Sequence, residues 1–238
     1  GTTSWRMTMA DHDRSSPVLW IVIVATVLFS GCSGPRHVYF PTEDGGLIFA
    51  EVYGQGERGV VLAHGGRFTK ESWTEQAQTL ADAGLRVVAI DFRGRGQSRG
   101  PTGSTDRDEG VQYDVLAAVR HLQQTRATTV SVVGASFGGW AAAKAAAMIP
   151  GEIDRIVLLA ATVDEPERLT GRKLFILARD DFRGEGELRL PEIQDQFDRT
   201  PEPKELVLLE GDAHAQYIFE TPQGDRLMRE ILRFLLEP

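Results

Sequence analysis

A serine between two glycines is the first group in the sequence whose setting suits chemistry. Residues 134–138 read GASFG, which fits the pattern G-x-S-x-G around Ser136. A serine hydroxyl becomes a nucleophile when a neighbouring base accepts its proton. The β-branched run TTVSVV precedes the motif and the helix-forming run WAAAKAAAM follows it, and a strand, a sharp turn and a helix in this order lift the hydroxyl above the sheet edge. We therefore predict Ser136 as a nucleophile, and Gly134 and Gly138 as positions where a side chain would collide with the neighbouring strand and helix.

The elements that must hold this serine alternate between short apolar strands and longer helical segments. HVYFP and LIFAEVY flank the turn at 43–46, which predicts a hairpin. Near-continuous apolar runs, typical of strands buried on both faces, follow at 59–65, 85–91, 128–135, 153–161, 173–178 and 205–211. Helices are expected at about 71–83, 106–124, 137–148, 187–198 and 222–236. This alternation predicts one α/β domain, with a mostly parallel central sheet flanked by helices.

Over residues 37–238 the sequence resembles the α/β-hydrolase family. Three segments carry the resemblance in the family's order: VVLAHGG at 60–66, DFRGRGQS at 91–98 and GASFGG at 134–139. The resemblance implies the α/β-hydrolase fold and a catalytic triad in the chain order Ser, Asp or Glu, His. Of the five histidines only His214 follows Ser136, so the family order leaves His214 as the candidate base. His64 precedes Ser136, and its counterpart in the family is a structural loop residue.

The triad acid should follow the strand KLFILA, where Asp180 and Asp181 both qualify. Adjacent residues at a strand end point to opposite sides, so only one of them can face His214. The family commonly has a small residue three positions before the acid, and Ala178 stands three before Asp181. This favours Asp181 over Asp180. The acid would hold the imidazole of His214, which takes the proton of Ser136 and later delivers it to the leaving group.

The family also implies an oxyanion hole made of two backbone N–H groups. One is that of Phe137, directly after the nucleophile. The family's placement puts the other on Gly66, with its neighbour Arg67 as the alternative. In DFRGRGQS, Arg93 is expected to organise a glycine-rich loop rather than to bind substrate.

A serine nucleophile favours acyl transfer through a covalent acyl-enzyme. Only residues 162–172 separate two of the predicted strands, where larger family members insert a helical cap. We therefore expect an open site and an esterase or lipase that hydrolyses short-chain or accessible carboxylic esters, its substrate being a small molecule. The alternatives are a thioesterase or peptidase of the same fold, and a catalytically inactive membrane-tethered binding lipoprotein. Four aromatic residues near the predicted site loops are candidates for an apolar acyl wall or for core packing: Phe68, Trp73, Phe137 and Trp140.

Composition excludes several other classes. The formal net charge is −8, without a Lys/Arg cluster, which argues against a nucleic-acid partner. One cysteine cannot form an internal disulfide, and five histidines without further cysteines do not make a structural zinc cage. The glycine-rich loops lack the Lys and Ser/Thr of a P-loop. We accordingly expect neither a metal nor a cofactor.

The first residues carry an apolar run, VLWIVIVATVLF at 18–29. A helix of this length rises about 18 Å, short of the roughly 30 Å of a bilayer core, so it fits a signal peptide better than a membrane span. The segment FSGC at 29–32 resembles the bacterial lipoprotein signal, which implies lipid attachment at Cys32. We predict a signal peptide at 1–31, a tether at 32–36 and the hydrolase domain at 37–238, exported and either membrane-anchored or secreted. The alternatives are a plain secretory signal and a buried helix.

Overall fold

The computed structural model describes residues 34–104, 106 and 108–238. From Gly34 onward these residues form one compact unit. The expected signal peptide and Cys32 lie outside the described residues. Within the described part of the chain, no helix combines the length and the apolar character that crossing a membrane requires.

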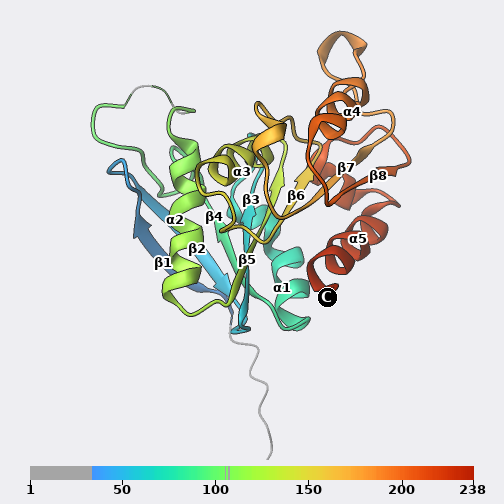
Figure 1. The fold of residues 1–238 in the computed structure, drawn as a ribbon. Coiled ribbons are helices and arrows are strands. Elements are labelled where there is room, and N and C mark those ends of the chain that lie inside the picture. Colours follow the sequence, from blue (N-terminus) through green and yellow to red (C-terminus); the bar gives the residue numbers. More distant parts are fainter. Residues whose placement is uncertain (1–33, 105, 107) are drawn as a thin grey trace, which may run out of the picture. The chain divides into compact units, whose positions relative to one another are not determined.

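An eight-stranded sheet runs through the described unit in the order β1-β2-β4-β3-β5-β6-β7-β8 (Figure 1). Strand β2 is antiparallel to its neighbours β1 and β4, and every other neighbouring pair is parallel. The strands are β1 (Arg36–Pro41), β2 (Leu47–Tyr53), β3 (Arg58–Ala63), β4 (Arg86–Ile90), β5 (Thr129–Ala135), β6 (Arg155–Leu159), β7 (Arg172–Ala178) and β8 (Lys204–Leu209). The prediction of an α/β fold with a mostly parallel sheet is confirmed.

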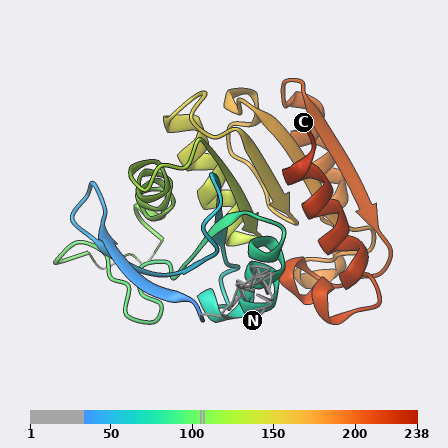
Figure 2. The same cartoon turned by 90° about the horizontal axis from the view of Figure 1, so that it is seen from below.

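Helices cover both faces of this sheet, with α2 and α3 on one face and α1 and α5 on the other (Figures 1 and 2). Helix α4 packs against β7. The α-helices are α1 (Thr74–Asp82), α2 (Val111–Gln124), α3 (Phe137–Met148), α4 (Leu190–Arg199) and α5 (Gly224–Leu236). Short 3-10 turns complete the unit: η1 (Lys70–Trp73), η2 (Pro166–Arg168), η3 (Gly184–Gly186) and η4 (Ala215–Glu220).

Three helices begin three or more residues later than their sequence pattern predicts. Helix α1 starts at Thr74 rather than at 71, because the 3-10 turn η1 occupies Lys70–Trp73. Helix α2 starts at Val111 rather than at 106, because Gly110 has a φ of 78°, a left-handed conformation that an α-helix does not contain. Helix α4 starts at Leu190 rather than at 187, because Leu188 forms an antiparallel bridge with Phe182. This small hairpin projects beside the end of β7 and brings Arg189 next to the residues that follow β7.

Helix α3 is central to the site because it starts directly after Ser136. All of its alanines are buried, and it packs against both β5 and α2. Small side chains let the helix approach the sheet closely: a Cβ at Gly134 would lie 2.5 Å from the Cα of Gly139, well inside van der Waals contact. The close approach therefore requires glycine at this position of β5.

Candidate active site

Ser136 lies in a sharp turn between β5 and α3. Its backbone has φ 50° and ψ −117°, a conformation that is unfavourable for a residue with a side chain and is retained at functional sites. Its N–H donates to the carbonyl of Leu159 on β6 at 2.8 Å. A Cβ at Gly138 would lie 2.2 Å from the carbonyl oxygen of Ala63, so the turn closes against β3 only with glycine there.

Three side chains from separate loops meet at this turn. The Nε2 of His214 lies 2.8 Å from the Oγ of Ser136. The Nδ1 of the same ring lies 2.7 Å from Oδ2 of Asp181. His214 follows β8 and Asp181 follows β7, and both strands are parallel to β5 in the sheet, so their carboxyl ends open onto the same edge. The arrangement can pass the proton of the Ser136 hydroxyl to the imidazole, with the carboxylate holding the ring.

Of the two candidate acids, Asp181 contacts His214. Asp181 is buried, whereas Asp180 is exposed and its N–H donates to the carbonyl of Gly211. The second oxygen of Asp181 has a partner that the sequence did not indicate: Nε of Arg189 lies 3.1 Å from Oδ1, and the Arg189 N–H donates to the Asp181 carbonyl at 2.9 Å. The carboxylate is thus fixed from both sides.

The loop that carries Gly66 lies beside Phe137. A Cβ at Gly66 would be 3.6 Å from the Cβ of Phe137, so the two predicted oxyanion residues are neighbours. Phe137 is the first residue of α3, and its N–H therefore has no intrahelical acceptor. Arg95 donates to the carbonyl of Gly66 at 2.5 Å. The alternative residue, Arg67, is exposed on the same loop.

Gln216 fixes this loop from the side of His214. It is 5% exposed. Its Oε1 accepts the N–H of Gly65 at 2.8 Å, and its Nε2 donates to the Oγ of Ser72 at 2.7 Å. Because Gln216 comes two residues after His214, it connects the histidine loop to the loop of Gly66.

His64 is buried and holds the loop internally. Its Nδ1 lies 2.8 Å from the carbonyl oxygen of Gly65, and its Nε2 accepts the N–H of Phe92 at 3.2 Å. Burial lowers the pKa of His64, so the ring stays neutral, with one donor and one acceptor as this pair of bonds requires. His64 thus connects two loops and makes no contact with Ser136 among its hydrogen bonds.

Arg93 lies in a buried cluster of charges away from the nucleophile. It donates to Asp114 on α2 through Nη2 at 2.7 Å and to Asp44 of the β1–β2 turn through Nη1 at 2.7 Å. Asp91 of the same segment accepts the N–H of Lys70 at 2.7 Å. The segment 91–98 thus holds loops together through hydrogen bonds, as its sequence suggested.

Two cavities open on Ser136. The His214-side cavity, of about 330 Å³, is lined by Gly65, Gly66, Arg67, Phe68, Ser136, Phe137, Phe182, Arg189, His214, Ala215 and Tyr217. The Trp140-side cavity, of about 350 Å³, is lined by Asp108, Ser136, Phe137, Trp140, Ala160, Thr162 and Arg189. The segment between β6 and β7 contains only the three-residue turn η2, so no cap lies over either cavity from this connection.

Of the four aromatic candidates, Phe68, Phe137 and Trp140 line these cavities. Trp73 does not: it is buried and packs edge-on against Phe219, with ring centroids 5.9 Å apart. Trp73 is the buried last residue of η1 and belongs to the core. Sequence reasoning missed Phe182 and Tyr217, which line the His214-side cavity because a hairpin and a 3-10 turn place them there.

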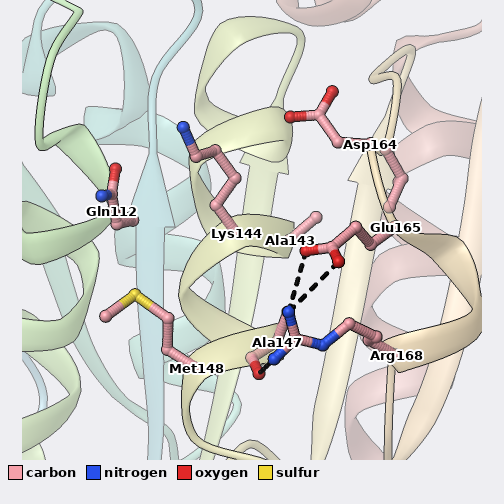
Figure 3. Close-up of a pocket in the computed structure, with 9 residues that line it drawn as sticks. Gln112, Ala143, Lys144, Ala147, Met148, Asp164, Glu165 and Arg168 are labelled. Carbon is pink, nitrogen blue, oxygen red and sulfur yellow. Dashed lines mark hydrogen bonds and ion pairs between the residues drawn. The ribbon is translucent and has the colours of Figure 1, made fainter.

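A further cavity, of about 150 Å³, lies beside helix α3 (Figure 3). None of Ser136, Asp181 and His214 lines it. Two of the charged side chains that line it pair with each other: Arg168 lies 2.9 Å from Glu165, and Arg168 also donates to the carbonyl of Ala147. Across the described residues, no group of three or more His, Cys, Asp or Glu side chains is arranged to hold a metal ion.

Comparison with known proteins agrees with this class of fold. The family model described as serine aminopeptidase, S33, matches residues 54–182. The chain belongs to this family of α/β hydrolases.

Curated relatives match part of the chain. A protein of the AB hydrolase superfamily from Bacillus subtilis is 32% identical over 124 residues, covering 52% of this chain and 44% of that protein. A non-heme chloroperoxidase from Kitasatospora aureofaciens is 35% identical over 100 residues, covering 41% of this chain and 34% of that protein. The chain thus spans less than half the length of these curated relatives.

Solved structures share the fold across most of the chain. An esterase from Pyrococcus furiosus superposes with a TM-score of 0.70 at 18% identity, covering 84% of this chain and 93% of that one. A bromoperoxidase from Bacillus anthracis superposes with a TM-score of 0.68 at 17% identity, covering 85% of this chain and all of that one. At such identities the likeness concerns the fold.

Proposed function

We propose that this protein is a serine hydrolase that cleaves carboxylic esters through an acyl-enzyme on Ser136. The observation that carries the proposal is the unbroken hydrogen-bonded line from Ser136 through His214 to Asp181, which ends at two open cavities. A nucleophile, a base in contact with it and a group that orients the base are the parts that acyl transfer needs.

In the first half-reaction the Oγ of Ser136 attacks the ester carbonyl while Nε2 of His214 takes its proton. Asp181 accepts the hydrogen bond of the Nδ1–H and stabilises the imidazolium. The carbonyl oxygen becomes negative, and the N–H groups of Phe137 and Gly66 would donate to it. His214 then gives the proton to the leaving alcohol, and the acyl group stays on Ser136.

In the second half-reaction a water molecule replaces the alcohol. His214 takes a proton from the water as it attacks the acyl carbonyl, and returns the proton to Ser136 as the acid leaves. The absence of a cap between β6 and β7 in the described residues leaves the cavities open, which supports action on short-chain or accessible esters.

Hydrolysis of p-nitrophenyl acetate and butyrate tests this proposal. The purified protein should release p-nitrophenol and be labelled at Ser136 by a fluorophosphonate. Ser136→Ala should abolish both. Unchanged hydrolysis in Ser136→Ala would contradict the mechanism, and a folded protein that neither reacts with the fluorophosphonate nor hydrolyses either ester would instead favour an inactive binding protein.

A second candidate is formation of peroxy acids, because relatives of this chain are named non-heme chloroperoxidases. Hydrogen peroxide in place of water would attack the acyl group on Ser136, so that a peroxy acid leaves and the serine hydroxyl is restored. Oxidation of bromide in the presence of acetate and hydrogen peroxide, lost in Ser136→Ala, would support it. Bromide oxidation that is unchanged in Ser136→Ala would refute the formation of peroxy acids on Ser136.

We also propose that the chain is exported and attached to a membrane through lipid on Cys32. The support is the sequence pattern at 18–32, with an apolar run directly before the single cysteine. Cys32→Ser should move the protein from the membrane fraction to the soluble fraction in a bacterial host. Continued membrane fractionation of Cys32→Ser would contradict lipid attachment.

A further inference from the structure

The charged side chains that line the His214-side cavity are basic. Two of its lining residues, Arg67 and Arg189, are cationic, and among the described residues that line it there is no Asp or Glu. The chain as a whole has a formal net charge of −8. Arg189 is itself paired with the buried Asp181, so the excess of positive charge on this side comes from Arg67, and Arg189 contributes the donors of its terminal nitrogens. Together the two side chains create a local preference for anions.

Arg189 is held in a fixed position. Its Nε and its backbone N–H both bind Asp181, at 3.1 and 2.9 Å, and its side chain is 23% exposed. The described residues offer no hydrogen-bond acceptor to its two terminal nitrogens. A guanidinium anchored in this way keeps donors available for a carboxylate at a small cost in side-chain entropy. Arg67, by contrast, is exposed and has no ion-pair partner among the described residues.

Aromatic side chains form the rest of the cavity. The rings of Phe68 and Tyr217 are 5.0 Å apart. Phe182 lies across a two-strand bridge from Leu188 and is 49% exposed, which is unusual for a large apolar side chain. Exposed aromatic groups at the mouth of a cavity offer apolar surface that a ligand can cover. The cavity thus combines flat apolar surfaces with two cations.

The two cavities play different parts in the proposed reaction. His214 lines only one of them, and the group that protonates the leaving oxygen must lie within hydrogen-bond reach of it. The leaving group therefore occupies the His214-side cavity, and the acyl group occupies the Trp140-side cavity. Its lining holds one acidic side chain, Asp108, and one basic side chain, Arg189, so the acyl side has no excess of positive charge.

We propose that the His214-side cavity selects esters whose alcohol half carries a carboxylate on an aromatic frame, with Arg189 and Arg67 binding the carboxylate. This inference rests on the proposed ester hydrolysis, which decides that the leaving alcohol occupies the His214-side cavity and the acyl group the Trp140-side cavity. The arginines and the aromatic lining are independent of that assignment, so binding can be measured separately from turnover.

The kinetic test compares 3- and 4-acetoxybenzoate with the matching acetoxybenzamides. Acid and amide share the acetyl group and the ring, and differ in the charge of the leaving group. For at least one isomer, kcat/KM should be about tenfold higher for the acid than for the amide, as expected for a charge-assisted hydrogen bond. Added salt should reduce the ratio, because Arg67 is exposed.

Variants assign the effect to residues. Arg189→Gln and Arg67→Gln should each lower the acid-to-amide ratio about threefold, and the double variant should bring the ratio close to one. The ratio is the measured quantity because Arg189 also holds Asp181, so its replacement lowers turnover of both esters. The matched control is Arg183→Gln: Arg183 belongs to the same hairpin as Phe182 but pairs with Glu192 and does not line the cavity. Arg183→Gln should leave the ratio unchanged.

Calorimetric binding of 3- and 4-hydroxybenzoate, compared with the hydroxybenzamides, gives a readout without turnover. The acids should bind more tightly, each single variant should reduce the difference, and the double variant of Arg189→Gln and Arg67→Gln should remove it. If no ester is hydrolysed but this arginine-dependent binding is observed, ester hydrolysis is refuted and the anion site stands. If the acids show no advantage in kinetics or in binding, or if the advantage survives both arginine variants, the inference is wrong.

Discussion

Replacement of Gln216 by leucine tests whether the loop of Gly66 must be held in place for activity. In the folded protein the Gln216 amide accepts the N–H of Gly65 and donates to Ser72. Leucine is of similar size but supplies neither bond. The N–H of Gly65 is then left without its acceptor in a buried position, and the residue whose N–H is predicted to stabilise the oxyanion follows directly in the chain.

The expected magnitudes follow from these contacts. A buried donor left without an acceptor costs about 1–3 kcal/mol, so the free energy of unfolding should fall by about 2 kcal/mol. Ser72 adds little, because its Oγ still donates to the carbonyl of Thr69. Loss of an entire oxyanion donor lowers kcat by about 10²–10³-fold. A donor that is displaced but still present should cost less, about 10- to 100-fold in kcat with KM nearly unchanged.

Gln196→Leu is the matched control. Gln196 is 7% exposed, and its Oε1 accepts the N–H of Val163 at 2.8 Å, the same kind of bond at the same distance. It should lose similar stability in urea unfolding and keep kcat within about twofold on p-nitrophenyl acetate. The reasoning fails if Gln216→Leu and Gln196→Leu have the same kcat, or if Gln216→Leu raises KM alone.

Three further results are expected. Asp181→Asn should lower kcat by about 10³–10⁴-fold while Asp180→Asn stays near wild type in the same ester assay; similar losses in both would contradict the contact with His214. Gly138→Ala should give less folded protein and a displaced Ser136, seen as loss of fluorophosphonate labelling, because its Cβ would lie 2.2 Å from a backbone oxygen; normal labelling would refute the need for glycine. Burial raises the pKa of Asp114 to about 6, although Arg93 opposes this. Because the folded-state pKa lies above the unfolded one, the contribution of Asp114 to stability is greatest below about pH 4 and is lost as the pH rises through about 6. Asp114→Asn should flatten that part of the curve of unfolding free energy against pH, and an unchanged curve would show that Asp114 is not the group responsible.

The sequence was most informative where a pattern is local. Apolar runs of strand length predicted six of the eight strands of the described unit to within a few residues, because a strand buried on both faces must be apolar throughout. The turn at 43–46 predicted the hairpin of β1 and β2. Helix starts were less accurate. The start of α2 depended on the backbone of Gly110, and that of α4 on a bridge between Phe182 and Leu188, and hydrophobic periodicity does not report on either.

Some residues of the candidate site could be identified from the sequence, and others only from the structure. Ser136, His214 and Asp181 could be named from motif, chain order and spacing, and the structure brings their side chains into hydrogen-bond contact. Their catalytic role, and that of the N–H groups of Gly66 and Phe137, stays a prediction. Gln216 carries one weak signal, its position two residues after His214. Nothing in the sequence indicated a role for Arg189, because it lies within the helix predicted at 187–198.

Residue type and order along the chain were thus enough to identify the fold class and the residues that can do chemistry, since nucleophile, base and acid belong to few residue types and the order of elements limits where they can lie. The sequence favoured Asp181 over Asp180, and the tertiary structure shows that Asp181 is the one in contact with His214. The second partner of the carboxylate and the lining of the two cavities depended on tertiary structure alone. The physical reason is that these contacts depend on how the backbone is folded. Gln216 and Gly65 lie far apart in sequence, and Arg189 reaches Asp181 only through the bridge between Phe182 and Leu188. Their geometry is set by how the strands pack side by side.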